Sequence, residues 1–552
     1  MLTAFLIENM APIMFASLIV FLLLGYPVAF SLSAVGIFFA WAGIELDLFT
    51  TNFLGALPGR VLAVMSNETL LAIPFFTLMG AILERSGMAE DLIDTIGQLF
   101  GPVRGGLGYA VIFVGALLAA TTGIVAASVI SMGLIALPIM LRYGYDRNLA
   151  TGVIMASGTL AQIIPPSIIL IVLADQLGAS VGDMYRGALI PALSLTGLYA
   201  LYVFVRSLIN PHIAPALPPE ARHLTEADGR IAITSLLVLL GAIVVGSYGF
   251  YTALGMLNPD MLQTDRQIYG ATLGFAVGYL VALLDRRYKF GLLSNIAQAV
   301  IIVLVPPLAL VFLVLGTIFL GVATPTEGGA MGAAGALLLA LSKRRLNFGV
   351  LSQAIDSTAR LSAFVLFILI GSRVFSLTFY GVDGHKWVED LLLLTPGGTI
   401  GFLVLVNLIV FFLGCFLDFF EIAFILIPLL APAASALGID LIWFGVILGI
   451  NLQSSYLTPP FGFALFFMRS VTPAKDYTDR VTGKRIRGIK TGEIYKAGVS
   501  FVVLQAIMVA ILVAFPNLAT VSDDHTGVDP DTVKIEIMGL DPTFDLAPLD
   551  LN

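Results

Sequence analysis

Two proline pairs in similar settings decide the fold of this chain: QIIPPSIIL at 162–170 and YLTPPFGFAL at 456–465. Proline removes a backbone donor and clashes with the preceding helical turn, so each pair should break a helix. Inside a bilayer such irregular backbone survives only where it lines a buried site. The carbonyls before each pair could then coordinate a hard cation such as Na⁺, and the following half-helix would present its N-terminus to an anion. A simple proline kink in a packed helix is the alternative.

The composition places the chain in a membrane. Of its 552 residues 58% are hydrophobic and only 12% are charged, whereas soluble domains carry about 25% charged residues. A membrane helix needs roughly 20 mostly apolar residues, and apolar stretches such as 11–24, 231–246, 301–320 and 499–515 approach that length. We therefore predict an all-α polytopic membrane protein, embedded in a lipid bilayer.

Several other functional classes lack their signatures. Cys415 is the only cysteine and the four histidines are scattered, so neither a disulfide framework nor a metal centre of these residues is expected. The chain has no GxxxxGK[ST] pattern for ATP and no HExxH cluster. We expect no enzyme activity, no cofactor and no nucleic-acid partner. A channel remains an alternative, although channels usually assemble from identical subunits around a pore.

An internal repeat relates the two proline pairs. Gly25 lies 140 positions before Pro165, and Gly321 lies 138 positions before Pro459. Between these landmarks, PFFTLMGAILERSGM (74–88) matches FVLFILIGSRVFSL (364–377), and ALLAATTGIVAASVI (116–130) matches VFFLGCFLDFFEIAF (410–424). Repeats of this kind are typical of transporters whose two halves have opposite topology and share a site between them.

The repeat, together with the polar loops, gives the expected domain organisation. We predict a first repeat at 1–175 (hairpin about 107–142, broken helix about 148–174), a connector with extra transmembrane helices at 176–300, a second repeat at 301–472 (hairpin about 399–437, broken helix about 441–470), a basic cytoplasmic loop at 473–498, a last transmembrane helix at 499–515 and an acidic, disordered tail at 516–552. Because Lys and Arg favour cytoplasmic loops, Arg142, Arg147 and 343–345 should also lie on the cytoplasmic side.

Two long apolar runs carry a polar residue at their centre. Thr121, Thr122 and Gly123 interrupt the run 109–141, and Asp418 interrupts the run 401–437. A helical hairpin that enters the membrane halfway, with its tip facing a broken helix, explains both. An acid inside a membrane segment is costly, so Asp418 is expected to be functional. A structural helix cap is the alternative role for Asp418, and Glu421 is the other acid that could be the functional one.

Three charged residues near these segments can also be assigned a role. Arg373 either extends to the membrane interface or pairs with a substrate carboxylate in a cavity. Arg85 lies beside Glu84 and a polar loop, which favours a surface role. Glu327 in TPTEGG is expected to cap the helix that it begins.

These landmarks resemble the large membrane subunit of the tripartite ATP-independent periplasmic (TRAP) transporters. The matching motifs are IPFFTLMG (73–80), GPVRGGLG (101–108), TTG (121–123), YGYDRN (143–148), QIIPPS (162–167), ATPTEGG (323–329), LD (417–418) and LTPPFG (457–462). The resemblance covers about 1–210 and 300–515. The TTGIV and ASGTLAQIIPPS forms look like the branch labelled for mannitol or chloroaromatic compounds.

The resemblance implies an elevator-type transporter in the bacterial cytoplasmic (inner) membrane, driven by a Na⁺ gradient. Its partners would be a small four-helix membrane subunit and a periplasmic substrate-binding protein. The implied first Na⁺ site comprises Thr122, Gly123, Ile164 and Pro165, and the second comprises Asp418, Thr458 and Pro459. Substrate would lie between them, in contact with Ser167, Arg373, Thr122 and Asp418. The family's first tip often reads Ser-Gly-Ser, whereas this chain has Thr122-Gly123-Ile124 and so lacks the second hydroxyl.

The predicted function is therefore Na⁺-coupled uptake of a small organic acid, of the carboxylate or 2-oxo acid type, as the large permease subunit of a tripartite system. The alternative is a stand-alone Na⁺- or H⁺-coupled carboxylate transporter that works without a binding protein.

Overall fold

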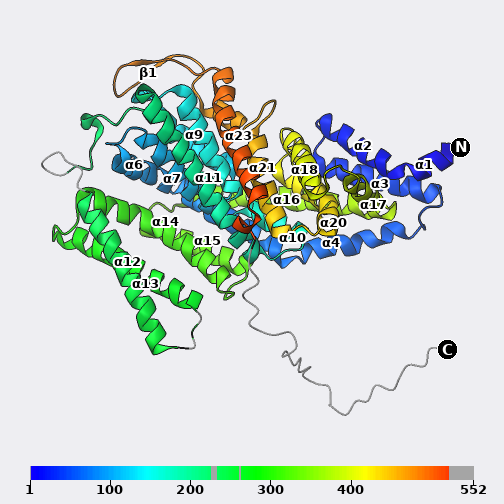
Figure 1. Cartoon of the computed structure of the whole chain (residues 1–552), viewed down its shortest axis with the longest axis horizontal. Coiled ribbons are helices and arrows are strands. Elements are labelled where there is room, and N and C mark those ends of the chain that lie inside the picture. Colours follow the sequence, from blue (N-terminus) through cyan, green and yellow to red (C-terminus); the bar gives the residue numbers. More distant parts are fainter. Residues whose placement is uncertain (1, 226–232, 260, 262, 521–552) are drawn as a thin grey trace, which may run out of the picture.

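The computed structural model describes residues 2–225, 233–259, 261 and 263–520 (Figure 1). In the first part of the chain the elements are α1 (Leu2–Glu8), α2 (Met10–Leu23), α3 (Val28–Glu45), η1 (Phe53–Ala56), α4 (Leu57–Met65), η2 (Glu68–Leu71), α5 (Ala72–Arg85), α6 (Met88–Phe100), α7 (Gly106–Thr122), α8 (Val125–Arg142), α9 (Arg147–Thr159), η3 (Leu160–Gln162), α10 (Ile168–Leu177), α11 (Val181–Ile209), η4 (Pro211–Ile213) and η5 (Pro219–Ala221).

The second part of the chain is also helical. Its elements are α12 (Thr234–Leu257), α13 (Gln263–Tyr288), α14 (Asn295–Phe319), α15 (Pro325–Ser342), α16 (Phe348–Gly381), α17 (Gly384–Leu393), α18 (Gly398–Gly414), α19 (Phe419–Ile425), α20 (Ile427–Ala436), α21 (Leu441–Tyr456), α22 (Phe463–Val471), β1 (Tyr477–Thr478), β2 (Arg485–Ile486), α23 (Thr491–Ala514) and η6 (Pro516–Leu518). Within the described ranges the short antiparallel pair β1–β2 is the only sheet.

Many of these helices are suited to a bilayer. Eight described helices are long and apolar enough to cross a membrane, or up to 11 if each of three bent pairs is one span. In the hydrophobic window of α12 only 17% of the residues are buried inside the protein, so most of its apolar surface must be covered by lipid or a partner. The prediction of an all-α polytopic membrane protein is confirmed.

The two hairpins of the sequence analysis are seen as consecutive helices. α7 and α8 are separated only by Gly123 and Ile124, and Gly123 adopts the left-handed conformation at φ 60°. Glycine suits this position because it carries no Cβ atom to clash there. The second hairpin consists of α18 followed by α19 and α20, which are bent by 52° relative to each other.

Each proline pair separates two half-helices. In the first half, α9 continues into η3 and ends before Pro165, and α10 begins at Ile168. In the second half, α21 ends at Tyr456 and α22 begins at Phe463. The missing proline donors account for both interruptions. The equivalence of the halves, their opposite topology and an elevator movement stay predictions.

Helices of the first half of the chain pack against helices of the second half. α3 packs on α16, and α15 packs on α5. Glycines permit this close approach: a Cβ at Gly36 would lie 2.9 Å from Cα of Phe375, and one at Gly371 would lie 2.6 Å from the Ala29 carbonyl oxygen. Small residues at helix contacts are the usual means of close packing in membranes. Consequently, α16 of the second half lies beside the helices that hold the first hairpin tip.

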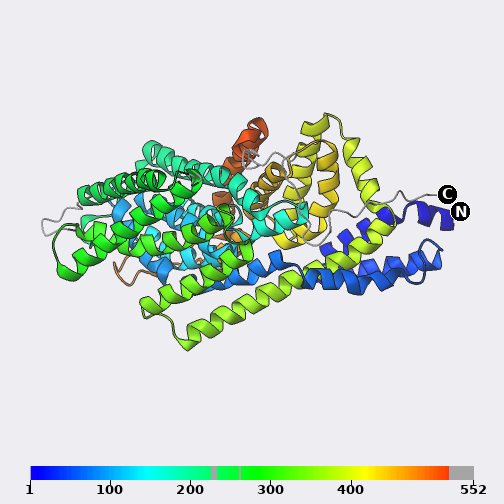
Figure 2. The same ribbon diagram turned by 90° about the horizontal axis from the view of Figure 1, so that it is seen from below.

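The segments outside the repeats have distinct positions. α12 and α13 pack on each other and project from the remaining helices (Figure 1). Seen from below, the long yellow-green α16 runs beside the blue helices α3 and α4 on which it packs (Figure 2). α11, in the segment predicted as a connector, packs on α7, α10, α21 and α23. α23 begins at Thr491, so the segment expected to be a basic loop up to 498 becomes helical earlier. The predicted disordered tail lies outside the described residues from 521 onward.

Candidate functional site

The tip of the first hairpin contacts the broken helix of the same half. A Cβ atom at Gly123 would lie 3.1 Å from Cγ1 of Ile168, the first residue of α10. The Thr122 hydroxyl donates to the Leu118 carbonyl at 2.9 Å, and Ser128 Oγ lies 3.1 Å from it across the tip. The positive φ and the close contact both favour glycine at position 123. Thr122 and Gly123 therefore lie beside the first break, as the predicted first cation site requires.

The first break itself is buried. Ile164 and Pro165 are both buried, and Ser167 has 0% relative exposure. The Ser167 hydroxyl donates to the Gln162 carbonyl at 2.9 Å, and Tyr185 donates its hydroxyl to the Ser167 carbonyl at 3.3 Å. Ser167 precedes α10 but makes no capping bond to it. The first amides of α10 are thus left without a side-chain cap, which suits an anion or a water molecule.

Two buried glutamines lie near the breaks. Gln162 and Gln453 have 0% exposure, and both polar atoms of each side-chain amide lack a hydrogen-bond partner among the described residues. α21, which carries Gln453, packs on η3, which carries Gln162. Buried polar groups are nearly always bonded to protein or to ordered water. These unpaired amides therefore mark a region where water, an ion or a ligand can bind.

Asp418 caps a helix at the second hairpin tip. Its Oδ1 accepts from the backbone N–H of Phe419 at 2.6 Å, and Glu421 Oε2 accepts from the Asp418 N–H at 2.8 Å, which forms a capping box. Tyr456, the last residue of α21, donates its hydroxyl to the same Oδ1. Asp418 thus makes the hydrogen bonds of a helix cap, which is the structural alternative to a functional role. The capping box also includes a bond from the Glu421 backbone N–H to the Asp418 side chain, so the carboxylate is held by three donors at the tip.

The second break is more open than the first. Pro459 is exposed and Thr458 is partly exposed. The Thr458 hydroxyl donates to the Ser454 carbonyl at 2.8 Å, within its own helix. Phe461, just after the proline pair, packs on Phe416 of the hairpin with ring centroids 5.7 Å apart. The tip and the break are thus in contact, but Tyr456 rather than Thr458 makes the hydrogen bond between them.

A cavity of about 460 Å³ opens beside the first hairpin tip. Three elements line it: α5 (Thr77, Gly80, Ala81, Glu84, Arg85), the hairpin (Thr122, Ile124, Ala126, Ala127) and α16 (Ser357, Arg360, Leu361, Phe364). Arg85 donates to Gln353 Oε1 at 2.7 Å and to Ser357 Oγ at 2.8 Å. The first turn of α8 has no side-chain cap. An uncapped helix N-terminus near arginines is a favourable environment for a carboxylate.

The same cavity is connected to the second hairpin through one aromatic contact. Phe364 of the cavity packs edge-on against Phe420 of α19, with ring centroids 6.5 Å apart. Phe420 is only two residues from Asp418. The cavity thus reaches Thr122 directly and approaches the second tip through Phe364.

Arg373 lies elsewhere. It lines a second cavity of about 430 Å³ together with Arg60 and Asn67. Arg360 and Arg373 are both on α16, and their separation along an α-helix corresponds to about 20 Å. Asn67 donates to Asp175 Oδ1 at 2.7 Å, close to the end of α10. Arg373 therefore faces a cavity, but not the one that Thr122 lines.

Sequence reasoning missed several of these residues. Arg85 is exposed, in agreement with a surface position, yet it lines the cavity at the first tip. Gln162, Gln453 and Tyr456 were not proposed, although polar residues in apolar segments often make contacts between membrane helices. A GxSxG pattern at 178–182 has a structural role, because the Ser180 hydroxyl accepts from the Asp183 N–H at the start of α11.

Comparison with known proteins identifies the family. The model of the family described as "Tripartite ATP-independent periplasmic transporter, DctM component" matches residues 15–296 and 292–518. The chain is 26% identical over 434 residues to a C4-dicarboxylate TRAP transporter large permease protein of Pseudomonas aeruginosa, covering 78% of this chain and 83% of that one. It is 26% identical over 448 residues to a sialic acid TRAP transporter large permease protein of Vibrio cholerae, covering 81% and 86%.

Two further similar proteins are a longer relative, of which this chain covers a smaller part, and a solved structure of low sequence identity. An isethionate TRAP transporter permease protein DctMQ of Oleidesulfovibrio alaskensis is 24% identical over 470 residues, covering 84% of this chain and 61% of that protein. Among solved structures, the YdaH transporter of Alcanivorax borkumensis is similar with a TM-score of 0.44 at 15% identity, covering 85% and 89%. At that level the structural likeness carries no argument about this chain.

Proposed function

The chain belongs to the DctM component family of the tripartite ATP-independent periplasmic transporters, and from that premise we propose that it performs Na⁺-coupled uptake of a small organic acid. It is a multi-pass large permease and not an enzyme, in keeping with its relatives. The finer assignments concern the substrate, the coupling ion, the partners and the movement.

The cavity at the first hairpin tip supports an acidic substrate. Arg85 and Arg360 line this cavity together with the uncapped first turn of α8. Relatives are named for C4-dicarboxylate, sialic acid and 2,3-diketo-L-gulonate, which are organic acids. Planar guanidinium groups bind carboxylates through two parallel hydrogen bonds. The cavity is therefore our candidate substrate site, with Arg85 and Thr122 as contacts.

The two tip-and-break contacts support Na⁺ coupling. The proposed first site is formed by Thr122, Gly123, Ile164 and Pro165, and the proposed second site by Asp418, Thr458 and Pro459. Hydroxyl, carbonyl and carboxylate oxygens are suitable ligands for a hard cation, and unwound backbone in transporters commonly supplies them. Asp418 would contribute a carboxylate oxygen, in addition to the bonds that its Oδ1 accepts from Tyr456 and Phe419.

The partners follow from the family. We propose a small four-helix membrane subunit and a periplasmic substrate-binding protein, with the assembly in the bacterial inner membrane. A relative named as a DctMQ permease, of which this chain covers 61%, is consistent with a second membrane component. An elevator movement of the hairpins and broken helices against the remaining helices would carry the substrate across the bilayer.

Reconstituted transport tests this function. The permease and its small subunit would be placed in liposomes, and uptake of the radiolabelled ligand of the associated binding protein would be measured under an inward Na⁺ gradient. Uptake should require both the Na⁺ gradient and the binding protein. A K⁺ gradient of the same size is the control for Na⁺.

Two results would contradict the proposal. Uptake without the binding protein would favour the stand-alone carboxylate transporter. Equal uptake under Na⁺ and K⁺ gradients would remove Na⁺ as the coupling ion while leaving the family assignment intact.

A further inference from the structure

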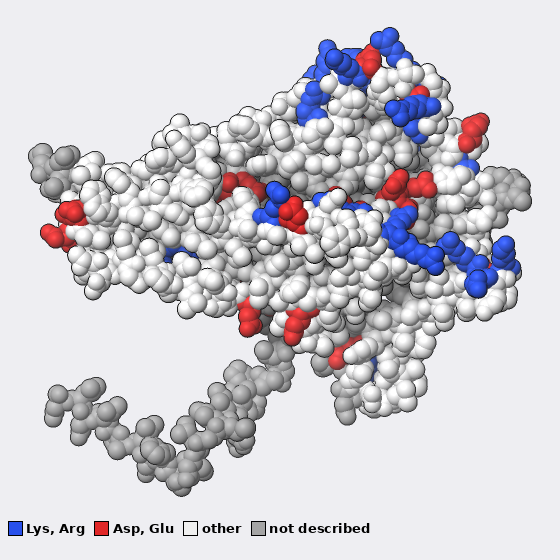
Figure 3. Space-filling model, turned by 180° about the vertical axis from the view of Figure 1, so that it is seen from behind, with Lys and Arg blue, Asp and Glu red and all other residues white. Residues whose placement is uncertain are grey.

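A separate basic cavity lies at the ends of several transmembrane helices. It has a volume of about 520 Å³ and is lined by residues from the α8–α9 turn, the segment after α11 and the β1–β2 hairpin. Five of its twelve lining residues are Lys or Arg and none is Asp or Glu: Arg142, Arg147, Lys484, Arg485 and Arg487. Figure 3 shows Lys and Arg gathered at the end of the molecule that carries this hairpin, whereas most of the remaining face is uncharged.

Nearby acids neutralise only three of these five cations. Arg142 Nε lies 3.1 Å from Asp479 Oδ1, Arg147 Nη2 lies 3.6 Å from Glu493 Oε1, and Arg485 Nη2 lies 3.2 Å from Asp476 Oδ2. Lys484 and Arg487 form no ion pair within the part of the chain that the structure describes. The cavity therefore carries a surplus of two positive charges.

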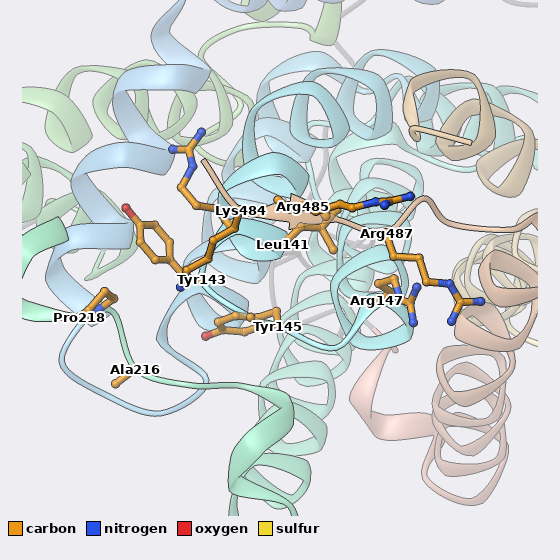
Figure 4. A pocket seen from close by; sticks show the side chains of 12 residues that line it. Leu141, Tyr143, Tyr145, Arg147, Ala216, Pro218, Lys484, Arg485 and Arg487 are labelled. Atoms are coloured by element: carbon orange, nitrogen blue, oxygen red, sulfur yellow. The ribbon is translucent and has the colours of Figure 1, made fainter. Parts of the chain in front are cut away.

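The arrangement of these side chains leaves donors available. The Nη1 atom of Arg147 is buried and has no hydrogen-bond partner among the described residues. In Figure 4, Arg147 and Arg487 lie together at one end of the cavity, and Lys484 extends past Tyr143 at the other. A buried guanidinium nitrogen without a partner is costly unless an acceptor fills the site. Lys484 and Arg487 are exposed and line the cavity, so an anion with several oxygen atoms would meet their donors.

The position of the cavity indicates where such an anion would come from. α8 and α11 are both candidate membrane spans. The cavity is lined by Arg142, the last residue of α8, and by Ala216 and Pro218 of the segment that follows α11. Tyr143 and Tyr145 line it, and tyrosine is enriched at membrane–water interfaces. The cavity thus lies at the predicted level of the lipid headgroups, on the side that the Lys and Arg distribution assigns to the cytoplasm.

We propose that this cavity binds the headgroup of an anionic phospholipid, with Arg487 and Arg147 as ligands of its phosphate group and Lys484 beside the other end of the headgroup. Basic cavities at the cytoplasmic ends of transmembrane helices are suited to phospholipid headgroups. The bound lipid joins the β1–β2 hairpin to the ends of α8 and α9. This proposal does not depend on the transported substrate or on the coupling ion.

Lipid binding to the purified full-length chain tests the proposal. Native mass spectrometry would measure the binding of phosphatidylglycerol and phosphatidylcholine added to detergent micelles, and thermal unfolding would be followed in parallel. Lys484→Gln/Arg487→Gln should weaken phosphatidylglycerol binding by about 10- to 30-fold, because each basic residue near an anionic membrane surface contributes on the order of 1 kcal/mol. The charge-conserving Lys484→Arg/Arg487→Lys should retain most of the binding.

A matched control is available in the same loop. Lys475 and Arg480 are exposed and do not line the cavity, so Lys475→Gln/Arg480→Gln removes the same charge without touching the site. Binding should change less than about twofold in this control, since distant charges are screened. An equal loss in both double variants would overturn the proposal.

A further measurement distinguishes binding of the lipid from binding of free phosphate. Inorganic phosphate at the same concentration as phosphatidylglycerol should raise the unfolding temperature much less than the lipid does. An equal rise would overturn the assignment to a lipid. If the Lys484→Gln/Arg487→Gln variant does not fold, phosphatidylglycerol and phosphatidylcholine are made to compete for the wild-type chain. Equal retention of the two lipids would overturn the proposal.

Discussion

The hydroxyl of Tyr456 donates a hydrogen bond to Oδ1 of Asp418, which joins the end of α21 to the tip of the second hairpin. The same oxygen accepts from the Phe419 N–H and so holds the first turn of α19. One carboxylate thus stabilises two elements that an elevator movement would have to carry together. We propose that the same carboxylate also binds Na⁺.

Replacing Asp418 with Asn separates its charge from its capping role. Asparagine caps helices about as well as aspartate, so Asp418→Asn should insert and assemble normally. Loss of the charged ligand should lower Na⁺-dependent uptake by about tenfold or more, because a bond to a charged group contributes roughly 1.5–3 kcal/mol. Uptake as a function of Na⁺ concentration measures this. Glu421→Gln should keep the Na⁺ dependence, and an unchanged response in Asp418→Asn would refute the second cation site.

Substitutions of Arg85 and Arg373 test which of the two cavities binds the substrate. Arg85→Gln should raise the substrate concentration for half-maximal uptake by about tenfold or more, since a guanidinium–carboxylate pair is lost. Arg373→Gln tests the prediction from the sequence that Arg373 binds substrate. Uptake over a range of substrate concentrations distinguishes them, and surface expression serves as the control for folding. A normal response in Arg85→Gln with a large defect in Arg373→Gln would move the substrate site to the second cavity.

Gly80 permits the first hairpin to pack against α5. A Cβ atom there would lie 2.5 Å from Cα of Thr122, and backbone cannot move aside cheaply. Gly80→Ala should therefore lower the free energy of unfolding by about 1–3 kcal/mol and reduce uptake, because the tip is displaced. Thermal unfolding in detergent measures the first effect. Gly197→Ala in α11 is the control: it meets no atom within 4 Å and should be neutral or slightly stabilising. Equal effects would argue against the close contact.

The β1–β2 hairpin should open at low pH. Hydrogen bonds from Thr482, together with Arg142, hold the pKa of the Asp479 carboxyl below its usual value of 3.8. A lowered pKa stabilises the folded form above the unfolded value, and this contribution is lost as the pH falls through the lower folded value. Pepsin cleavage within 475–490 should thus stay slow at pH 5 and increase below about pH 3.8.

A variant at neutral pH provides the control for that experiment. Asp479→Asn removes the charge that Arg142 pairs with, so trypsin should cleave after Arg480 and Lys484 faster than in the wild type at pH 7. Cleavage rates that do not differ would show that the ion pair does not hold the hairpin.

Some local features could be predicted because they depend on neighbouring residues. The proline pairs break their helices because the ring removes a donor wherever it occurs. Glu327 caps α15 through a reciprocal capping box with Thr324, and Gly123 ends α7 with a positive φ. The apolar composition alone indicated a helical membrane protein. Each of these inferences needed only a few adjacent residues or the overall composition.

Contacts between distant segments could not be predicted in the same way. Arg85 appeared to be a surface residue because its neighbours are polar, and only the packing of α16 beside α5 forms the cavity around it. Arg373 lines a cavity with Arg60 rather than the one that Thr122 lines, and its role in substrate binding stays a prediction. Tyr456 gave no signal of its own, since its bond to Asp418 depends on how α21 meets the second hairpin.

The sequence by itself determined that this is a membrane transport protein with two proline-broken helices, each matched to an apolar hairpin. Those conclusions rest on hydrophobicity and backbone chemistry, which act locally. The tertiary structure alone decided which charged side chains share a cavity, and that a short basic hairpin covers the ends of α8 and α9. The physical reason is that helix packing brings together residues hundreds of positions apart, and their charges matter to one another only at contact distance.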